Sequence, residues 1–140
     1  MEKQYLLVAE QMIFRNNRLT AINIWDQLTA IHSPAKFNFD LAFICGPSWQ
    51  PGEYDLKFKI KAVTTGEEFE VGAIKVKITS EQSVFNAIAS NVNIAMGEES
   101  GNVIFIVERD GQEIYSREYP VVYFYKIKQE SQEAQEPVEA

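Results

Sequence analysis

Two residues of this chain could together form a nucleophile and its base. His32 is the only histidine and Cys45 the only cysteine among the 140 residues. A cysteine nucleophile needs a nearby base to form its thiolate, and both residues fall at ends of neighbouring predicted strands, where they could meet. The alternative is that His32 is an exposed loop residue and Cys45 a small hydrophobic residue of the core. The sequence favours this alternative.

Three carboxylates, those of Glu10, Asp26 and Asp40, lie within apolar strand-like runs. A buried pair of carboxylates could serve as general acid and general base. More often such residues face solvent or cap the edge of a sheet. We therefore expect no catalytic residue among them.

Metal and nucleotide sites of the common kinds are not expected. One histidine and one cysteine do not supply the usual ligand set of zinc within one chain. Calcium needs several oxygen ligands, but the predicted loops offer only Asp110 in one and Glu98 and Glu99 in another, without Asp-x-Asp spacing. Neither of the glycine-rich phosphate-binding motifs, Gly-x-Gly-x-x-Gly and Gly-x-x-x-x-Gly-Lys, occurs in the sequence. The sequence therefore predicts no cofactor, no metal and no enzyme activity.

The composition is that of an acidic globular protein with a formal net charge of −7. This charge argues against binding to nucleic acid or to an anionic membrane. No apolar run approaches the roughly 18 residues that span a bilayer, and the N-terminus has no signal-peptide pattern. A single cysteine and the lack of an N-glycosylation sequon fit a reducing compartment. We expect a cytoplasmic protein.

The length predicts one domain, covering residues 1–128. Residues 129–140, "QESQEAQEPVEA", contain four glutamates and a proline but only one branched aliphatic residue, Val138. Such a segment has too little apolar surface to fold alone. We expect a disordered acidic tail whose simplest role is solubility.

The body of the chain has the pattern of β-strands. From Tyr54 to Ala62, apolar and polar residues alternate, and the alternation resumes after "TTGE" with a shift near Gly72 that predicts a β-bulge. Asn16-Asn17 and Asp110-Gly111 predict hairpin turns. Residues 84–96 fit a strand or a helix, and we favour a strand. The predicted class is an all-β, two-sheet antiparallel β-sandwich of about eight strands.

The order of these segments resembles a family of small bacterial β-sandwich proteins of unknown function. The resemblance spans roughly residues 5 to 125 and rests on "AEQMIFRNNRLTAINIWDQL", a loop with Pro34, "FNFDLAFI", the central hairpin and "GNVIFIVERDGQEI". It implies a single domain, immunoglobulin-like or C2-like in outline, and it implies no site. Relatives tend to have an aromatic residue before the loop proline, where this chain has "IHSPAKF".

One predicted hairpin carries a basic stripe. If the bulge at Gly72 holds, five lysines share one face of the hairpin: Lys57, Lys59, Lys61, Lys75 and Lys77. The stripe could dock an acidic partner, including the tail of the chain itself. Alternatively, it is a solvated face that discourages edge-to-edge aggregation. The acids Asp55, Glu68 and Glu70 interrupt the stripe, so the second interpretation is favoured.

Apolar residues exceed what a two-layer sandwich can bury. "YPVVYFY" has aromatic residues on both faces, and "LLV", "MIF" and "VIFIV" are also apolar on both faces. Either loops cover the outer faces or copies of the chain associate. In the loop "CGPSWQPGEY", Trp49 either closes one end of the sandwich or stands out as an anchor for a partner. The first interpretation is slightly favoured.

These patterns predict a non-enzymatic protein–protein interaction module that self-associates as a homo-oligomer and whose partner the sequence does not name. The residues predicted to make the contact are Trp49, Tyr119, Tyr123 and Tyr125. One alternative is a small-ligand binder with a pocket lined by Trp25, Trp49 and Tyr54. The second alternative is an enzyme that uses His32 and Cys45 or a buried carboxylate pair.

Overall fold

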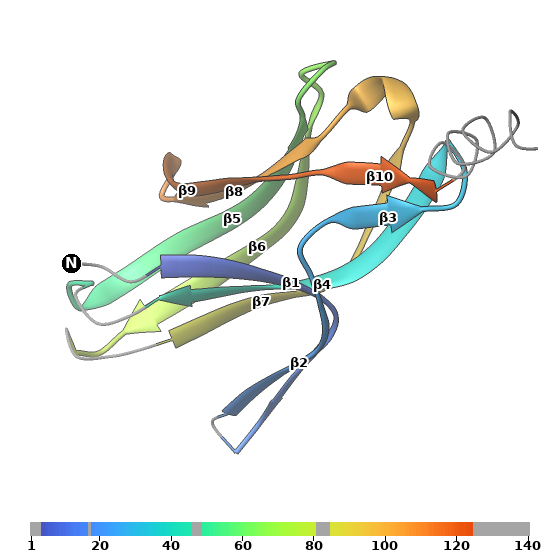
Figure 1. Cartoon of the computed structure of the whole chain (residues 1–140). Helices are drawn as coiled ribbons and strands as arrows, with labels where there is room; N and C mark the ends of the chain where they lie inside the picture. Colours follow the sequence, from blue (N-terminus) through green and yellow to red (C-terminus); the bar gives the residue numbers. More distant parts are fainter. Residues whose placement is uncertain (1–3, 17, 46–48, 81–84, 125–140) are drawn as a thin grey trace, which may run out of the picture.

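The computed structural model describes residues 4–16, 18–45, 49–80 and 85–124, and these form two antiparallel sheets packed face to face (Figure 1). This confirms the predicted all-β sandwich. The strands are β1 (Gln4–Arg15), β2 (Arg18–Trp25), β3 (Leu28–Ala30), β4 (Ala35–Cys45), β5 (Gly52–Ala62), β6 (Glu68–Ile78), β7 (Phe85–Met96), β8 (Val103–Arg109), β9 (Gln112–Tyr119) and β10 (Val121–Tyr123), with a 3-10 helix η1 (Glu98–Ser100) before β8. In the described part of the chain, no helix is long and apolar enough to cross a membrane.

The strand order identifies the connectivity. One sheet has the order β2-β1-β4-β7, the other β6-β5-β8-β9, and β3 and β10 form a short parallel pair. The order β1-β4-β7 opposite β6-β5-β8-β9 corresponds to strands A-B-E opposite C′-C-F-G of an immunoglobulin-like sandwich. The structure therefore decides between the immunoglobulin-like and C2-like outlines that the sequence left open.

The alternation, the bulge and one of the predicted turns are confirmed, whereas Asn17 of the predicted Asn16-Asn17 turn lies outside the described residues. Leu56, Phe58 and Ile60 are buried at alternate positions of β5. Between Phe58 and Lys59 the register with β6 shifts by one residue, so the predicted bulge lies at Val71, beside Gly72. At the tip of the β8–β9 hairpin, Asp110 and Gly111 have φ of 51° and 85°, in the left-handed region that a two-residue hairpin turn requires.

The ambiguous segment is a strand, as favoured, from Phe85 to Met96; Val84 lies outside the described residues. Its apolar residues change phase once, because one extra residue of β7 is accommodated opposite Asp40 of β4. Asn91, at this bulge, has a φ of 57°. Asparagine tolerates this conformation better than branched residues do.

The main core lies between the two sheets. Phe39 of the first sheet meets Phe105 of the second with ring centroids 5.8 Å apart, and Phe105 packs on Tyr119 at 4.9 Å. Edge-to-face contacts of this kind add to the free energy gained from burial. The core residues therefore hold the strands of opposite sheets in a fixed relation.

The β1–β2 hairpin departs from the sandwich. β1 pairs with β4 only from Gln4 to Ala9, whereas its pairing with β2 continues to Arg15. The far half of the hairpin therefore extends beyond the two sheets as a ribbon (Figure 1). Asp40 of β4 ties the hairpin to the sheet where β1 leaves β4, because one of its carboxylate oxygens accepts a hydrogen bond of 2.7 Å from the backbone N–H of Met12.

Candidate functional site

Trp49 is a core residue that closes one end of the sandwich. It is only 2% exposed, and its ring centroid lies 5.0 Å from that of Tyr54 and 4.9 Å from that of Phe85. The Tyr54 hydroxyl donates a hydrogen bond of 2.6 Å to the carbonyl oxygen of Gln50, which holds the loop down. This placement fits the lid interpretation and leaves no exposed indole to anchor a partner.

The tyrosines predicted to contact a partner do not form an exposed surface. Tyr119 is 1% exposed and Tyr123 is 7% exposed, while Tyr125 lies outside the described residues. These two side chains are covered because the end of the chain bends at Pro120 and pairs with β3. The backbone N–H of Leu28 donates to the Pro120 carbonyl at 2.9 Å, which fixes this bend.

Burial changes the acidity of both described tyrosines of this segment. Desolvation raises the pKa of the Tyr119 phenol, and the nearby Arg117 opposes this rise. Desolvation also raises the pKa of Tyr123, against a hydrogen bond with Ser33. Both phenols therefore stay protonated at neutral pH, as expected for tyrosines of the core.

His32 and Cys45 cannot act together. They lie at opposite ends of β4, since His32 precedes Ala35, the first residue of the strand, and Cys45 is the last. An eleven-residue strand spans about 33 Å. Cys45 is also fully buried, whereas His32 is exposed. The possibility that they meet is excluded because they flank the same strand, and the favoured interpretation of an exposed His32 and a buried Cys45 is confirmed.

The three carboxylates do not form an acid pair. Asp40 is nearly buried, and its two oxygens accept the backbone N–H groups of Met12 and Asn91, each at 2.7 Å. Glu10 accepts a bond from the side-chain amide of Asn23, and Asp26 is exposed. Asp40 thus satisfies backbone groups of β1 and β7 where both depart from regular pairing with β4. Among the residues that the structure describes, no group of histidine, cysteine and acidic side chains could hold a metal ion.

The five lysines of the basic stripe share the outer face of the second sheet, as predicted, but acids lie among them. Lys59 forms salt bridges with Glu68 at 3.3 Å and with Glu108 at 3.1 Å. Hydrogen bonds to these two carboxylates raise the pKa of Lys59. The cross-strand neighbours of the other lysines are Asp55 for Lys75, Glu53 for Lys77, Glu68 for Lys61 and Glu108 for Lys57. The face is therefore of mixed charge, which favours the solvated interpretation over an acidic partner.

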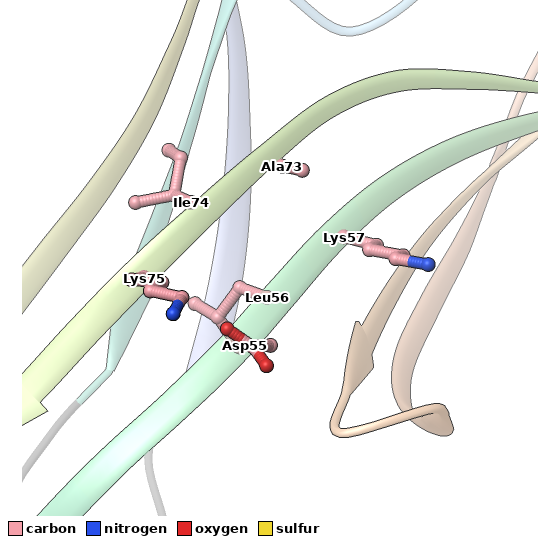
Figure 2. A pocket seen from close by; sticks show the side chains of 6 residues that line it. All are labelled: Asp55, Leu56, Lys57, Ala73, Ile74 and Lys75. Atoms are coloured by element: carbon pink, nitrogen blue, oxygen red, sulfur yellow. The ribbon is translucent and has the colours of Figure 1, made fainter.

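A shallow pocket of about 230 Å³ lies on this face (Figure 2). Its lining residues are Asp55, Leu56, Lys57, Ala73, Ile74 and Lys75. Figure 2 shows Lys57 and Ile74 pointing in opposite directions from the two strands, with the small Ala73 between them. The pocket exists because Ala73 is short beside long charged side chains, so it offers no enclosed apolar volume for a small ligand.

The three rings predicted to line a ligand pocket, Trp25, Trp49 and Tyr54, take part in different contacts of the described structure. Trp25 packs on Phe39, with centroids 5.6 Å apart, in the main core. Trp49 and Tyr54 contact each other instead at the end of the sandwich. Binding of a small ligand by these three residues stays a prediction.

A second apolar cluster lies outside the main core, at a position that the sequence did not predict. It consists of Ala9, Met12 and Ala42, with Leu7, Leu19, Ala21 and Ile88 packed against them. Leu6 and Val8 of β1 point into the main core, so Leu7 and Ala9 lie on the opposite, outer face of the sheet. The signal in the sequence was the "LLV" run, which is apolar on both faces.

Exposed apolar side chains adjoin this cluster. Tyr5 is 48% exposed and lies opposite Ile44 in the register, and Ile24 is 61% exposed and lies opposite Ala9. Residues paired across antiparallel strands share a face. We call the whole set the apolar face: Tyr5, Leu7, Ala9, Met12, Leu19, Ala21, Ile24, Ala42, Ile44 and Ile88.

The fold and this face define a small immunoglobulin-like β-sandwich with an apolar outer surface on one sheet. The chain matches no known family model, and its sequence is not significantly similar to any curated protein. The structure agrees with the small β-sandwich fold that the resemblance implied. Membership of the family of small bacterial sandwich proteins stays a prediction.

Proposed function

We propose that this protein is a non-enzymatic interaction module that self-associates through the apolar face. One observation carries the proposal: Tyr5 and Ile24, 48% and 61% exposed, extend an apolar cluster over the outer side of the β2-β1-β4-β7 sheet. A contiguous apolar surface of this kind on a globular domain is typical of an interface. The outer face of the other sheet is occupied by the lysines and their acidic neighbours.

A second copy of the chain is the partner that the surface favours. The residues of the apolar face are uncharged, so two such faces meet without burying an unpaired charge. The adjoining edge strand β2, "RLTAINIW", has no lysine, acid or proline, and its one charge is Arg18 at its first position. By contrast, the edge strands β6 and β9 carry several charges, and β6 has a bulge.

Edge strands protected by charges and bulges resist pairing with other chains, and β2 lacks that protection. Antiparallel pairing of β2 with β2 of a second copy would join the two four-stranded sheets around a two-fold axis and place the two apolar faces side by side as one larger apolar surface. The fully buried, single Cys45 supports a reducing compartment, and we place the module in the cytoplasm.

The test is the mass of the full-length chain in solution, measured by sedimentation velocity across a range of concentrations. We expect a dimer for the wild type and a monomer for Ile24→Lys, which places a charge on the apolar face. The matched control is Ile31→Lys, because Ile31 is 67% exposed but lies after β3, away from this face.

A wild-type chain that remains monomeric at about 100 µM, where even weak dimers populate, would overturn the proposal. An equal loss of mass in both lysine variants would also count against it, because the effect would then not depend on the apolar face.

A further inference from the structure

A groove runs between the edges of the two sheets at the margin where β6 and β7 meet. These strands belong to opposite sheets and lie alongside each other (Figure 1). Within the described ranges, β6 forms a ladder only with β5, and β7 only with β4. Each strand therefore presents an edge of backbone N–H and C=O groups without a ladder partner, and the edge of β7, which has no charged residue, is the one that an added strand can use.

Gly72 brings the two edges together at one level. A Cβ at Gly72 would lie 3.0 Å from the Cβ of Ala89 on β7, closer than such atoms normally approach. Just beyond this contact, β6 has its bulge at Val71 and β7 has its bulge at Asn91. Bulges bend a strand and increase its twist, so the two edges separate after the contact.

The space that opens there is a groove of about 330 Å³. Three consecutive residues of each strand line it: Phe69, Glu70 and Val71 from β6, and Asn93, Ile94 and Ala95 from β7. Three residues of strand extend about 10 Å, so the groove holds three to four residues of an extended chain.

The lining specifies the chemistry of its occupant. Phe69, Val71 and Ile94 supply apolar side chains, which suit apolar residues at alternate positions of a strand. Glu70 is exposed, and it forms no salt bridge with any described residue, since the nearby Lys59 pairs with Glu68 and Glu108. The unpaired carboxylate favours a basic side chain in the occupant.

We propose that this groove binds an extended peptide segment of another protein, which pairs as an added strand with the free edge of β7. The segment carries apolar residues at alternate positions and a lysine or arginine facing Glu70. In immunoglobulin-like domains a strand D lies beside strand E, the counterpart of β7, and the incoming strand takes that position. Main-chain hydrogen bonds provide affinity in this mode, and the side-chain pockets provide selectivity.

The groove and the apolar face can operate separately. β7 and β2 are the two opposite edges of the same four-stranded sheet. The peptide site therefore does not depend on self-association, and it is tested in the Ile24→Lys background, in which the apolar face is disrupted.

The probe is a capped hexapeptide, Lys-Val-Thr-Val-Thr-Val, titrated into the full-length Ile24→Lys chain to about 1 mM, a range that detects weak peptide binding. The readout is the NMR shift of the Asn93, Ile94 and Ala95 amides. Two further peptides carry N-methyl groups at odd or at even positions. Because alternate N–H groups of a strand point to the same side, only one of these two peptides should lose binding, by tenfold or more.

Charge provides the second arm of the test. We expect Glu70→Lys to weaken binding of the lysine peptide about fivefold or more, and a peptide with glutamate in place of lysine to recover it. The control is Glu113→Lys, the same change on the exposed β9 edge, where affinity should not change. No amide shift at about 1 mM peptide, or equal effects of the two N-methyl patterns, would overturn the proposal.

Discussion

The guanidinium carbon of Arg109 lies 4.5 Å from the centre of the Trp49 ring, so a cation stacks on the indole that closes the end of the sandwich. Arg109 is the last residue of β8 and also lies 5.5 Å from the Tyr54 ring. A cation–π contact of this kind contributes about 0.5–2 kcal/mol, depending on its exposure. The loop that precedes β5 is therefore held to both sheets by one aromatic residue.

Trp49→Ala should destabilise the domain strongly. Removing a buried aromatic side chain typically lowers the free energy of unfolding by about 3–5 kcal/mol, through lost burial and the cavity left behind. Urea unfolding followed by circular dichroism measures the change. Arg109→Met, which removes the cation but retains an apolar stem, should cost no more than about 2 kcal/mol. A Trp49→Ala variant as stable as the wild type would instead support a surface role.

Asp40→Asn should weaken the junction between β1, β4 and β7. Asparagine has the same shape but only one acceptor oxygen, so one of the N–H groups of Met12 and Asn91 loses its acceptor. We expect a loss of about 1–3 kcal/mol in the free energy of unfolding. The control is Asp26→Asn, an exposed position, where the change should stay within about 0.5 kcal/mol. Equal effects at the two sites would show that the Asp40 bonds contribute little.

Gly72→Ala should destabilise the margin where β6 and β7 meet. The new methyl group would lie 3.0 Å from the Ala89 side chain, and overpacking of this kind costs about 1–3 kcal/mol. In the background Ala89→Gly, the same substitution should cost less, because the clashing group is gone. A double-mutant cycle from urea unfolding should therefore give a coupling of at least about 0.5 kcal/mol. Additive effects would contradict the close approach.

Stability should fall as the pH rises above 10, and Tyr119 should contribute to the fall. Burial raises the pKa of this phenol above its ordinary value of 10.0, so the folded state holds its proton more tightly than the unfolded state does. The resulting stability is fully present below pH 10 and is lost as the pH rises through the raised pKa. The measurement is the free energy of unfolding in urea at pH values between about 9 and 12, a range that includes the ordinary pKa of a phenol.

Lysines also titrate in this range, and the raised pKa of Lys59 acts in the same direction. Comparison with Tyr119→Phe isolates the phenol, because phenylalanine keeps the ring in contact with Phe105 but does not ionise. The variant should show a shallower loss of stability above pH 10. Parallel curves for the two proteins would mean that Tyr119 ionises equally in the folded and unfolded states.

The sequence by itself determined the local structure. The alternation along β5, the bulge at Val71 beside Gly72 and the Asp110-Gly111 turn were predictable because each depends on residues near one another in the chain. The two-faced apolar runs also predicted apolar side chains outside the main core, where a second apolar cluster lies. These patterns are local, so they can be recognised without knowing which strands pair.

Only the tertiary structure decided which segments meet. Strand order depends on contacts between residues far apart in the sequence, and a period of two does not name the partner of a strand. This is why His32 and Cys45 could be imagined together although β4 separates them, and why Trp49 could be read as lid or anchor until its ring contacts were known. The apolar face and the β6–β7 groove arise from the same non-local pairing, which places β2 and β7 at the two edges of one sheet.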